Sequence, residues 1–122
     1  MATTPVPYTN LVANDDIANP AGTAVTAGAG NGGLVADAHP EVTIIRAANA
    51  SGGAGTVTVK AGDYPPAIAA GQGDLTSASI ANGGSAFLGP FESGRFLRND
   101  GSMIIETSVA MTLTAFRVPR NT

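Results

Sequence analysis

Turn-forming residues punctuate this chain about every 8–12 positions, so its regular segments must be short. Turns rich in Gly, Asn and Asp fall at 49–55, 82–84 and 99–101. Between the turns apolar and polar residues alternate, and no stretch of useful length repeats with the 3.6-residue period of an amphipathic helix. Short alternating segments separated in this way are typical of an antiparallel β-sandwich or barrel.

The clearest strand pair lies between residues 41 and 60. β-Branched side chains are frequent at 41–48, and residues 56–60 alternate between Val and either Thr or Lys. The Gly-rich connection between these two segments predicts a β-hairpin. Further strands are expected at 75–80, 85–91, 95–98, 102–107 and 110–118, with two short ones near 8–13 and 23–27.

These segments predict an all-β fold, a single antiparallel β-sandwich. Long connections at 64–73 and 89–94 favour a jelly-roll or Greek-key arrangement over a simple meander. The inward member of the isoleucine pairs 44–45 and 104–105 stays open, because a one-residue slip exchanges the two faces of a strand. The expected core consists of Val42, Ile44, Val57, Val59, Leu75, Ile80, Phe87, Phe96, Ile104, Met111 and Leu113.

Residues 1–40 have few large apolar side chains, and four prolines there interrupt any helix. We therefore divide the chain into an extended N-terminal arm with one or two short strands (1–40) and a β-sandwich domain (41–122). Ordering such an arm costs conformational entropy, so something must bury it, and proline-rich extended segments often lie along another chain or add a strand to it. Deletion of residues 2–12 is expected to leave the sandwich folded but to weaken attachment or oligomerisation.

Two groups of residues are candidates for contact with other chains. The net charge of −3 argues against a general nucleic-acid or membrane-surface binder, so we assign them to protein contacts. Arginines near the C-terminal end would pair with acids on a partner or a neighbouring copy. The arm candidates are Pro5, Val6, Pro7, Tyr8, Leu11 and Val12, and the arginines are Arg95, Arg98 and Arg117.

The side chains that usually carry catalysis are scarce. The chain has no Cys, which removes disulfides, zinc-thiolate sites and a cysteine nucleophile. Asp37, His39 and Glu41 would share one face of a strand and could hold a metal there, although the solvated start of a strand explains the same pattern. His39 is the only histidine, and no serine lies in a nucleophile elbow. We expect no enzyme, no cofactor and no metal site.

Two short motifs match by letter only. Gly28-x-Gly30-x-x-Gly33 resembles a dinucleotide fingerprint, but the segment before Pro40 is too short for the helix that the motif needs. Asn49-Ala50-Ser51 is a glycosylation sequon, and the N-terminus carries no secretion signal, so we read the sequon as chance. No apolar stretch is long enough to span a membrane, and synthesis in a cytoplasm is expected.

Several segments together resemble small all-β head decoration (cement) proteins of tailed bacteriophages. They are Lys60-Ala-Gly-Asp63-Tyr-Pro-Pro66, Gly84-Ser-Ala-Phe-Leu-Gly-Pro-Phe91, the turn at Asp100-Gly101 and a last strand ending in Phe116-Arg-Val118. The resemblance covers roughly residues 41–118, and no motif of residues 1–40 takes part in it.

The resemblance implies a virion structural protein on the outer capsid surface. Such proteins usually form trimers that clamp neighbouring major capsid subunits, a task that needs surface area and no catalytic side chain. A tail, connector or fibre-associated module is the alternative. A carbohydrate-binding sandwich would need an exposed aromatic platform, for which the chain offers no Trp and only Tyr8 and Tyr64.

Overall fold

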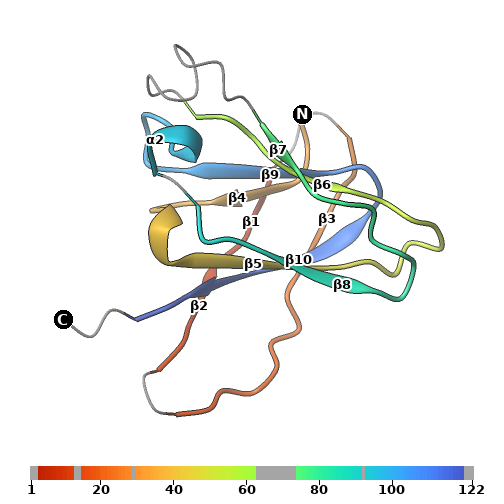
Figure 1. Ribbon diagram of the computed structural model, residues 1–122, viewed down its shortest axis with the longest axis horizontal. Helices are drawn as coiled ribbons and strands as arrows, with labels where there is room; N and C mark the ends of the chain where they lie inside the picture. The colour runs from red at the N-terminus through yellow and green to blue at the C-terminus, as the bar shows by residue number, and fades with distance from the viewer. Residues whose placement is uncertain (1–2, 13–14, 29, 63–73, 92, 120–122) are drawn as a thin grey trace.

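Eight strands pair in a nested order within residues 3–12, 15–28, 30–62, 74–91 and 93–119, the part of the chain that the computed structural model describes (Figure 1). The antiparallel pairs are β3 (Thr23–Val25) with β10 (Met111–Arg117), β4 (Gly33–Val35) with β9 (Met103–Thr107), β5 (Thr43–Ala48) with β8 (Ser85–Leu88), and β6 (Val57–Val59) with β7 (Leu75–Thr76). The chain from β3 to β10 is thus one long hairpin, in which β3, the first of these eight strands, pairs with β10, the last. Pairing of β10 with β5 and of β6 with β9 rolls this hairpin into a jelly roll.

The rolled hairpin forms two packed sheets, which confirms the predicted all-β sandwich. Two more strands, β1 (Thr4–Pro5) and β2 (Tyr8–Asn10), join the eight strands of the roll. Sheet A has the strand order β1-β4-β9-β6-β7, and sheet B the order β2-β10-β5-β8 with β3 also beside β10. Two parallel pairs, β1 with β4 and β2 with β10, make both sheets mixed where a purely antiparallel sandwich is expected. Both parallel pairs come from the N-terminal segment, and the eight strands of the roll are antiparallel throughout.

The N-terminal segment belongs to the sandwich, which corrects the division at residue 40. β1 (Thr4–Pro5) lies in sheet A and β2 (Tyr8–Asn10) in sheet B, so the chain crosses between the sheets at Val6, which is 3% exposed. β3 and β4 also precede residue 40, and each is a strand of the roll. Three buried valines, Val6, Val25 and Val35, anchor this segment in the core of its own chain.

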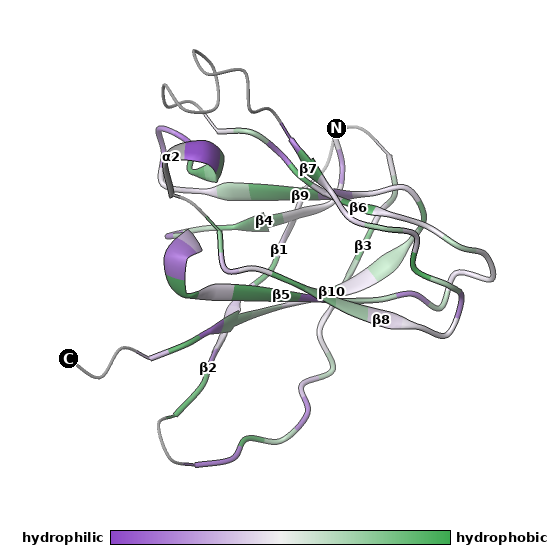
Figure 2. Cartoon of the chain, in the orientation of Figure 1, coloured by the Kyte–Doolittle hydropathy of each residue, from purple (hydrophilic) through white to green (hydrophobic). Residues whose placement is uncertain are grey.

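Alternation of side chains across the strands builds the core (Figure 2). Both β5 and β9 alternate regularly between buried and half-buried residues. Ile45 and Ile105 are the inward isoleucines, each 0% exposed. Of the predicted core residues, the following are buried: Val57, Val59, Ile80, Phe96, Met111 and Leu113. Leu75 is partly buried against the core.

Four residues that were predicted to lie in the core are not buried. Val42, Ile44 and Ile104 are half-buried, because the inward face of β5 begins at Thr43 and that of β9 at Met103. Phe87 is 66% exposed, because its neighbour Leu88 takes the inward position on β8. For Ile44, Phe87 and Ile104 the error is a shift by one residue, which places a side chain on the opposite face of its strand, whereas Val42 precedes β5.

Two predicted strand segments contain helical turns instead. η1 (Pro40–Val42) precedes β5, and α2 (Ser93–Phe96) replaces the expected strand at 95–98. The turn at α2 lets Phe96 pack edge-on against Phe91, with ring centroids 5.5 Å apart. The long connection expected at 64–73 lies outside the described residues, and Tyr64 with it.

Candidate functional site

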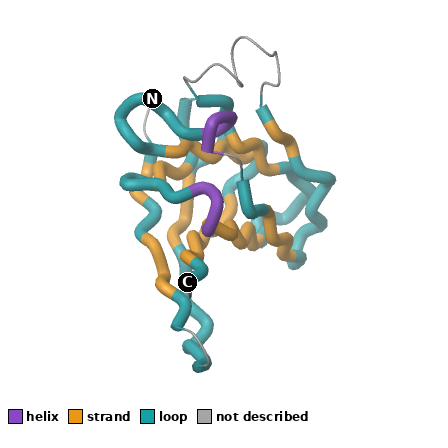
Figure 3. Tube along the Cα trace, turned by 60° about the vertical axis from the view of Figure 1, so that its left-hand side comes forward, coloured by secondary structure: helices purple, strands orange, loops and turns teal. Residues whose placement is uncertain are grey.

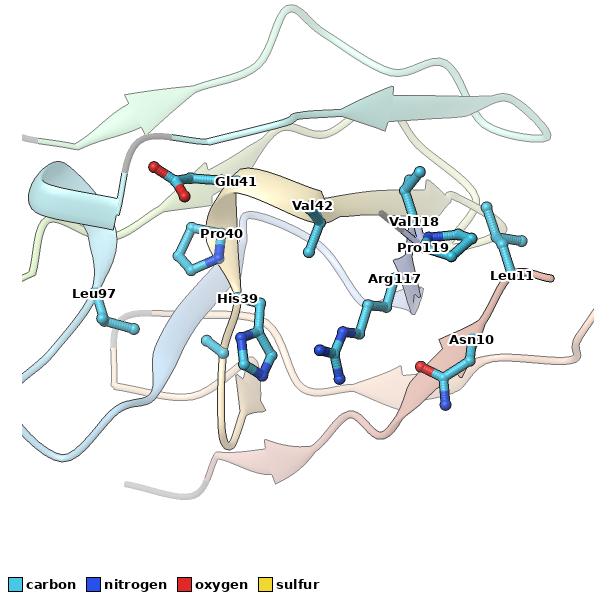
Figure 4. Close-up of a pocket in the computed structure, with 11 residues that line it drawn as sticks. Asn10, Leu11, His39, Pro40, Glu41, Val42, Leu97, Arg117, Val118 and Pro119 are labelled. Carbon is cyan, nitrogen blue, oxygen red and sulfur yellow. The ribbon is translucent and has the colours of Figure 1, made fainter. Parts of the chain in front are cut away.

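A groove of about 710 Å³ lies at one end of the sandwich (Figure 4). The connection between β4 and β5 forms one wall, and the ends of β2 and β10 form the other. Its lining mixes apolar side chains with three charged or titratable ones: Asn10, Leu11, Ala38, His39, Pro40, Glu41, Val42, Leu97, Arg117, Val118 and Pro119. Two predicted contact residues, Leu11 from the N-terminal segment and Arg117 from the last strand, meet in this groove.

Arg117 is placed by the register of β10. It stands opposite Thr43 of β5 on one side and Asn10 of β2 on the other. Leu113 and Ala115 are buried, so Arg117 continues the inward face of β10 to the open end of the sandwich. Its side chain is exposed, and among the described residues no hydrogen bond or ion pair engages the guanidinium group.

The polar side chains of the groove point in two directions. In Figure 4 the side chains of Asn10, His39 and Arg117 point to the same side, whereas Glu41 points away from them. Arginine presents a planar set of N–H donors that matches a carboxylate, and the imidazole and amide add further donors. This arrangement can receive an anionic group beside an apolar wall.

A closed ring of hydrogen bonds fixes the wall that carries His39. The His39 backbone N–H donates to Tyr8 Oη over 2.8 Å, and the Thr43 hydroxyl donates to the His39 carbonyl oxygen over 2.6 Å. Since the single Thr43 hydroxyl proton is used there, Tyr8 donates to Thr43 Oγ1, at 2.6 Å. Tyr8, a predicted contact residue, therefore serves an internal role and joins β2 to the start of β5.

Replacement Tyr8→Phe should lower the free energy of unfolding by about 1–2 kcal/mol, because it removes a hydroxyl that both donates and accepts in this ring. Urea unfolding followed by circular dichroism measures the change. The matched control is His39→Ala, which keeps the ring because only backbone atoms of His39 take part. An equal loss in both variants would contradict the assignment.

The other two predicted arginines are used within the chain. Arg95 stacks on the ring of Phe96 at 4.8 Å and donates to the Asp74 carbonyl oxygen at 3.3 Å. Arg98 lies beside the turn in which the hydroxyl and N–H of Ser102 hydrogen-bond to Asp100. Those two hydrogen bonds lower the pKa of Asp100 below its usual value. Neither arginine lines the groove, so the structure brings only Arg117 to it.

The remaining arm candidates differ in exposure. Val6 is buried, whereas Pro5 and Pro7 on either side of it are exposed. Val12 is 56% exposed and begins a loop that projects from the sandwich between β2 and β3 (Figures 1 and 3). We call residues 11–12 and 15–22 the projecting loop.

An arginine that sequence reasoning missed holds the far end of the projecting loop. Arg46 on β5 donates to the Asn19 side chain and to the Pro20 carbonyl oxygen, the latter over 2.7 Å. It also donates to Thr114 over 3.0 Å and lies 5.6 Å from the ring centroid of Phe116. No sequence signal marked Arg46 as an anchor, because its hydrogen-bond partners Asn19, Pro20 and Thr114 lie far from it in the sequence.

The structure also resolves the weaker motifs. Asp37, His39 and Glu41 do not share a strand, since Asp37 has a left-handed backbone (φ 49°) and Glu41 lies in η1. No group of three His, Asp or Glu side chains suited to a metal occurs among the residues described. Gly30 donates its N–H to Glu106 over 2.9 Å, so this part of the glycine-rich loop binds its own chain. Asn49 of the sequon is 1% exposed.

An ion-pair network lies at sheet A, where Lys60 meets Asp74 and the β9 residue Glu106. Lys60 Nζ is 2.8 Å from Asp74 Oδ2 and 3.9 Å from Glu106 Oε1. The hydrogen bond from Lys60, helped by the Ala61 N–H, lowers the pKa of Asp74, and the same bond raises the pKa of Lys60. Both partners are more than one-third exposed, so the pair adds little stability and fixes local geometry instead.

The described residues thus form a jelly-roll protein with a groove at one end. The polar side chains of Asn10, His39 and Arg117 in this groove are suited to contact with an anionic segment. Comparison with protein-family models, with curated proteins and with solved structures found no match. No helix within the described ranges has the length and apolar character needed to cross a membrane.

Proposed function

We propose that this chain is a virion structural protein that decorates a bacteriophage capsid as a homo-oligomer and stabilises it by bridging neighbouring major capsid subunits. The observation that carries the proposal is that the jelly roll presents features suited to contact: the projecting loop, the groove with Arg117, and the edge strand β8 with its exposed Phe87. The resemblance of residues 41–118 to decoration proteins supplies the identity of the partner.

The edge strand β8, with its exposed Phe87, is the surface that we assign to the capsid. β8 is an edge strand of sheet B, and its Phe87 side chain is 66% exposed. An exposed edge strand offers unpaired backbone groups to another chain, and an exposed aromatic side chain adds apolar area to the contact. A protein that works by contact needs such a surface, and it needs no reactive side chain.

The test is the composition of purified phage particles. Quantitative mass spectrometry should find this chain in a copy number of the same order as the major capsid protein. Absence from the particles would overturn the proposal, and a few copies per particle would favour the tail, connector or fibre alternative. Capsids lacking the chain should bind added wild-type protein but bind Phe87→Ser at least about tenfold more weakly, whereas Phe87→Leu, which keeps an apolar side chain at the same position, serves as the matched control.

A further inference from the structure

We infer that the groove receives the projecting loop of a second copy of this chain, with Arg117 and His39 of one copy facing Asp15 and Asp16 of the next. This contact rests on the proposed function only in assuming a homo-oligomer, and it assigns the residues that would build it. It is a contact between two different surfaces, the loop of one copy and the groove of its neighbour.

The groove supplies the donors. Arg117 and His39 are exposed and, with Asn10, point to one side of the groove, while Glu41 points away (Figure 4). The apolar side chains of Leu11, Val42 and Val118 line the same space. An aspartate carboxylate can accept two parallel N–H donors from a guanidinium, an arrangement stronger than a single neutral hydrogen bond.

The projecting loop supplies the anions. Asp15 and Asp16 are adjacent and exposed. Among the described residues their carboxylates take part in one hydrogen bond, in which the Asp16 N–H donates to Asp15 Oδ1 over 2.9 Å. Ile17, half-buried, follows them and offers an apolar side chain beside the two charges.

Within one chain these charges do not meet. The ion pairs of the described residues join Lys60 to Asp74 and Glu106, and they involve neither the loop aspartates nor Arg117. Both ends of the loop are held to the sandwich, by the Leu11 N–H on the Arg117 carbonyl oxygen at 3.0 Å and by Arg46 at Pro20. The loop between these two anchors projects from the sandwich in both views of the chain (Figures 1 and 3), and Asp15 and Asp16 within it are exposed.

A contact between two unlike surfaces can repeat from copy to copy and closes into a ring when the rotation allows. Charge complementarity of this kind sets register and speeds association more than it adds affinity. It also predicts that added salt weakens the association, because the charges lie at the surface.

The test combines charge reversal with charge exchange in the full chain. Sedimentation equilibrium at about 0.5 mM chain and low salt should show oligomers of the wild type. Arg117→Glu alone, and Asp15→Lys with Asp16→Lys, should each weaken association by about tenfold or more. The chain with all three substitutions should regain association, since the charges are then complementary again. Arg95→Glu, which changes net charge equally but lies outside the groove, is the control.

A direct binding measurement tests the contact between loop and groove without capsids and without an oligomer. A synthetic peptide of residues 11–22 should bind the chain that carries Asp15→Lys and Asp16→Lys, and it should not bind when Arg117→Glu is added. A monomeric wild type, oligomers that survive every charge reversal, or a groove that binds an acidic segment of the capsid protein instead of the peptide would each overturn the inference. Failure of the wild-type oligomer to bind capsids would overturn the proposed function alone.

Discussion

Deletion of residues 2–12 should prevent stable folding of the sandwich, in contrast to the tolerance expected from sequence. The deletion removes β1 and β2, each of which is hydrogen-bonded into a sheet, together with the buried Val6 side chain. It also breaks the ring formed by Tyr8, Thr43 and the His39 backbone. The sum of these losses is about 5 kcal/mol or more, comparable to the whole stability of many domains.

A matched pair of point variants isolates the cause. Val6→Ala removes a side chain that is 3% exposed, and Val12→Ala makes the same change at 56% exposure. Val6 is tightly packed, since a Cβ placed on Gly33 would lie 2.7 Å from Val6 Cγ2. Val6→Ala should therefore lower the free energy of unfolding by about 2 kcal/mol, and Val12→Ala by less than about 0.5 kcal/mol.

Urea unfolding monitored by circular dichroism measures all three variants, with solubility of the truncated chain as a first readout. A truncated chain that unfolds with wild-type stability would show that the crossing at Val6 is dispensable. The sandwich would then be complete with β3–β10, and the N-terminal segment would return to the role of a separate arm.

The strand pattern was predictable where side chains alternate over several residues. β6 and β10 fall within predicted strands, and Met111 and Leu113 of β10 are buried as expected. The N-terminal strands were harder to recognise as part of the sandwich because they are two or three residues long. Their stability comes from pairing with strands distant in sequence, and local propensity does not report such pairing.

The groove was predictable in its parts but not in its assembly. Leu11 and Arg117 were both singled out for contact, yet nothing in their spacing brings them together. The parallel pairing of β2 with β10 does so, since it sets Asn10 opposite Arg117. In the sequence His39 stands out only as a possible metal ligand, and its position at the groove follows from the ring with Tyr8, which has no sequence signature.

Asn49 is a buried amide that joins two loops at the other end of the sandwich. Its Nδ2 donates to the Gly53 carbonyl oxygen at 2.8 Å and to that of Ile80 at 2.9 Å. Its Oδ1 accepts from the N–H and hydroxyl of Ser51, at 3.1 and 2.8 Å. The side chain thus uses both donors and its acceptor, which is why a polar group can be 1% exposed without penalty.

Replacement Asn49→Asp should lower the free energy of unfolding by about 3 kcal/mol or more at neutral pH. The substitution keeps the shape but turns a donor into a carboxylate oxygen that faces two carbonyl oxygens in a buried site. Burial and the carbonyls should raise the pKa of the new carboxyl group in the folded state. The loss relative to the wild type is then largest above that pKa and shrinks as pH falls below it, because the protonated group is neutral and can donate again.

The control is the same replacement of Asn by Asp at position 82, which lies in the same pair of loops. Asn82 is exposed, and its Oδ1 accepts the Gly52 N–H over 3.0 Å, so a carboxylate there can still accept. Asn82→Asp should change stability by less than about 0.5 kcal/mol at any pH between about 4 and 8. Urea titrations of both variants and the wild type across that range provide the measurement. Equal effects at the two sites, or a loss at Asn49 that does not diminish in acid, would mean that Asn49 is not the donor that holds these loops together.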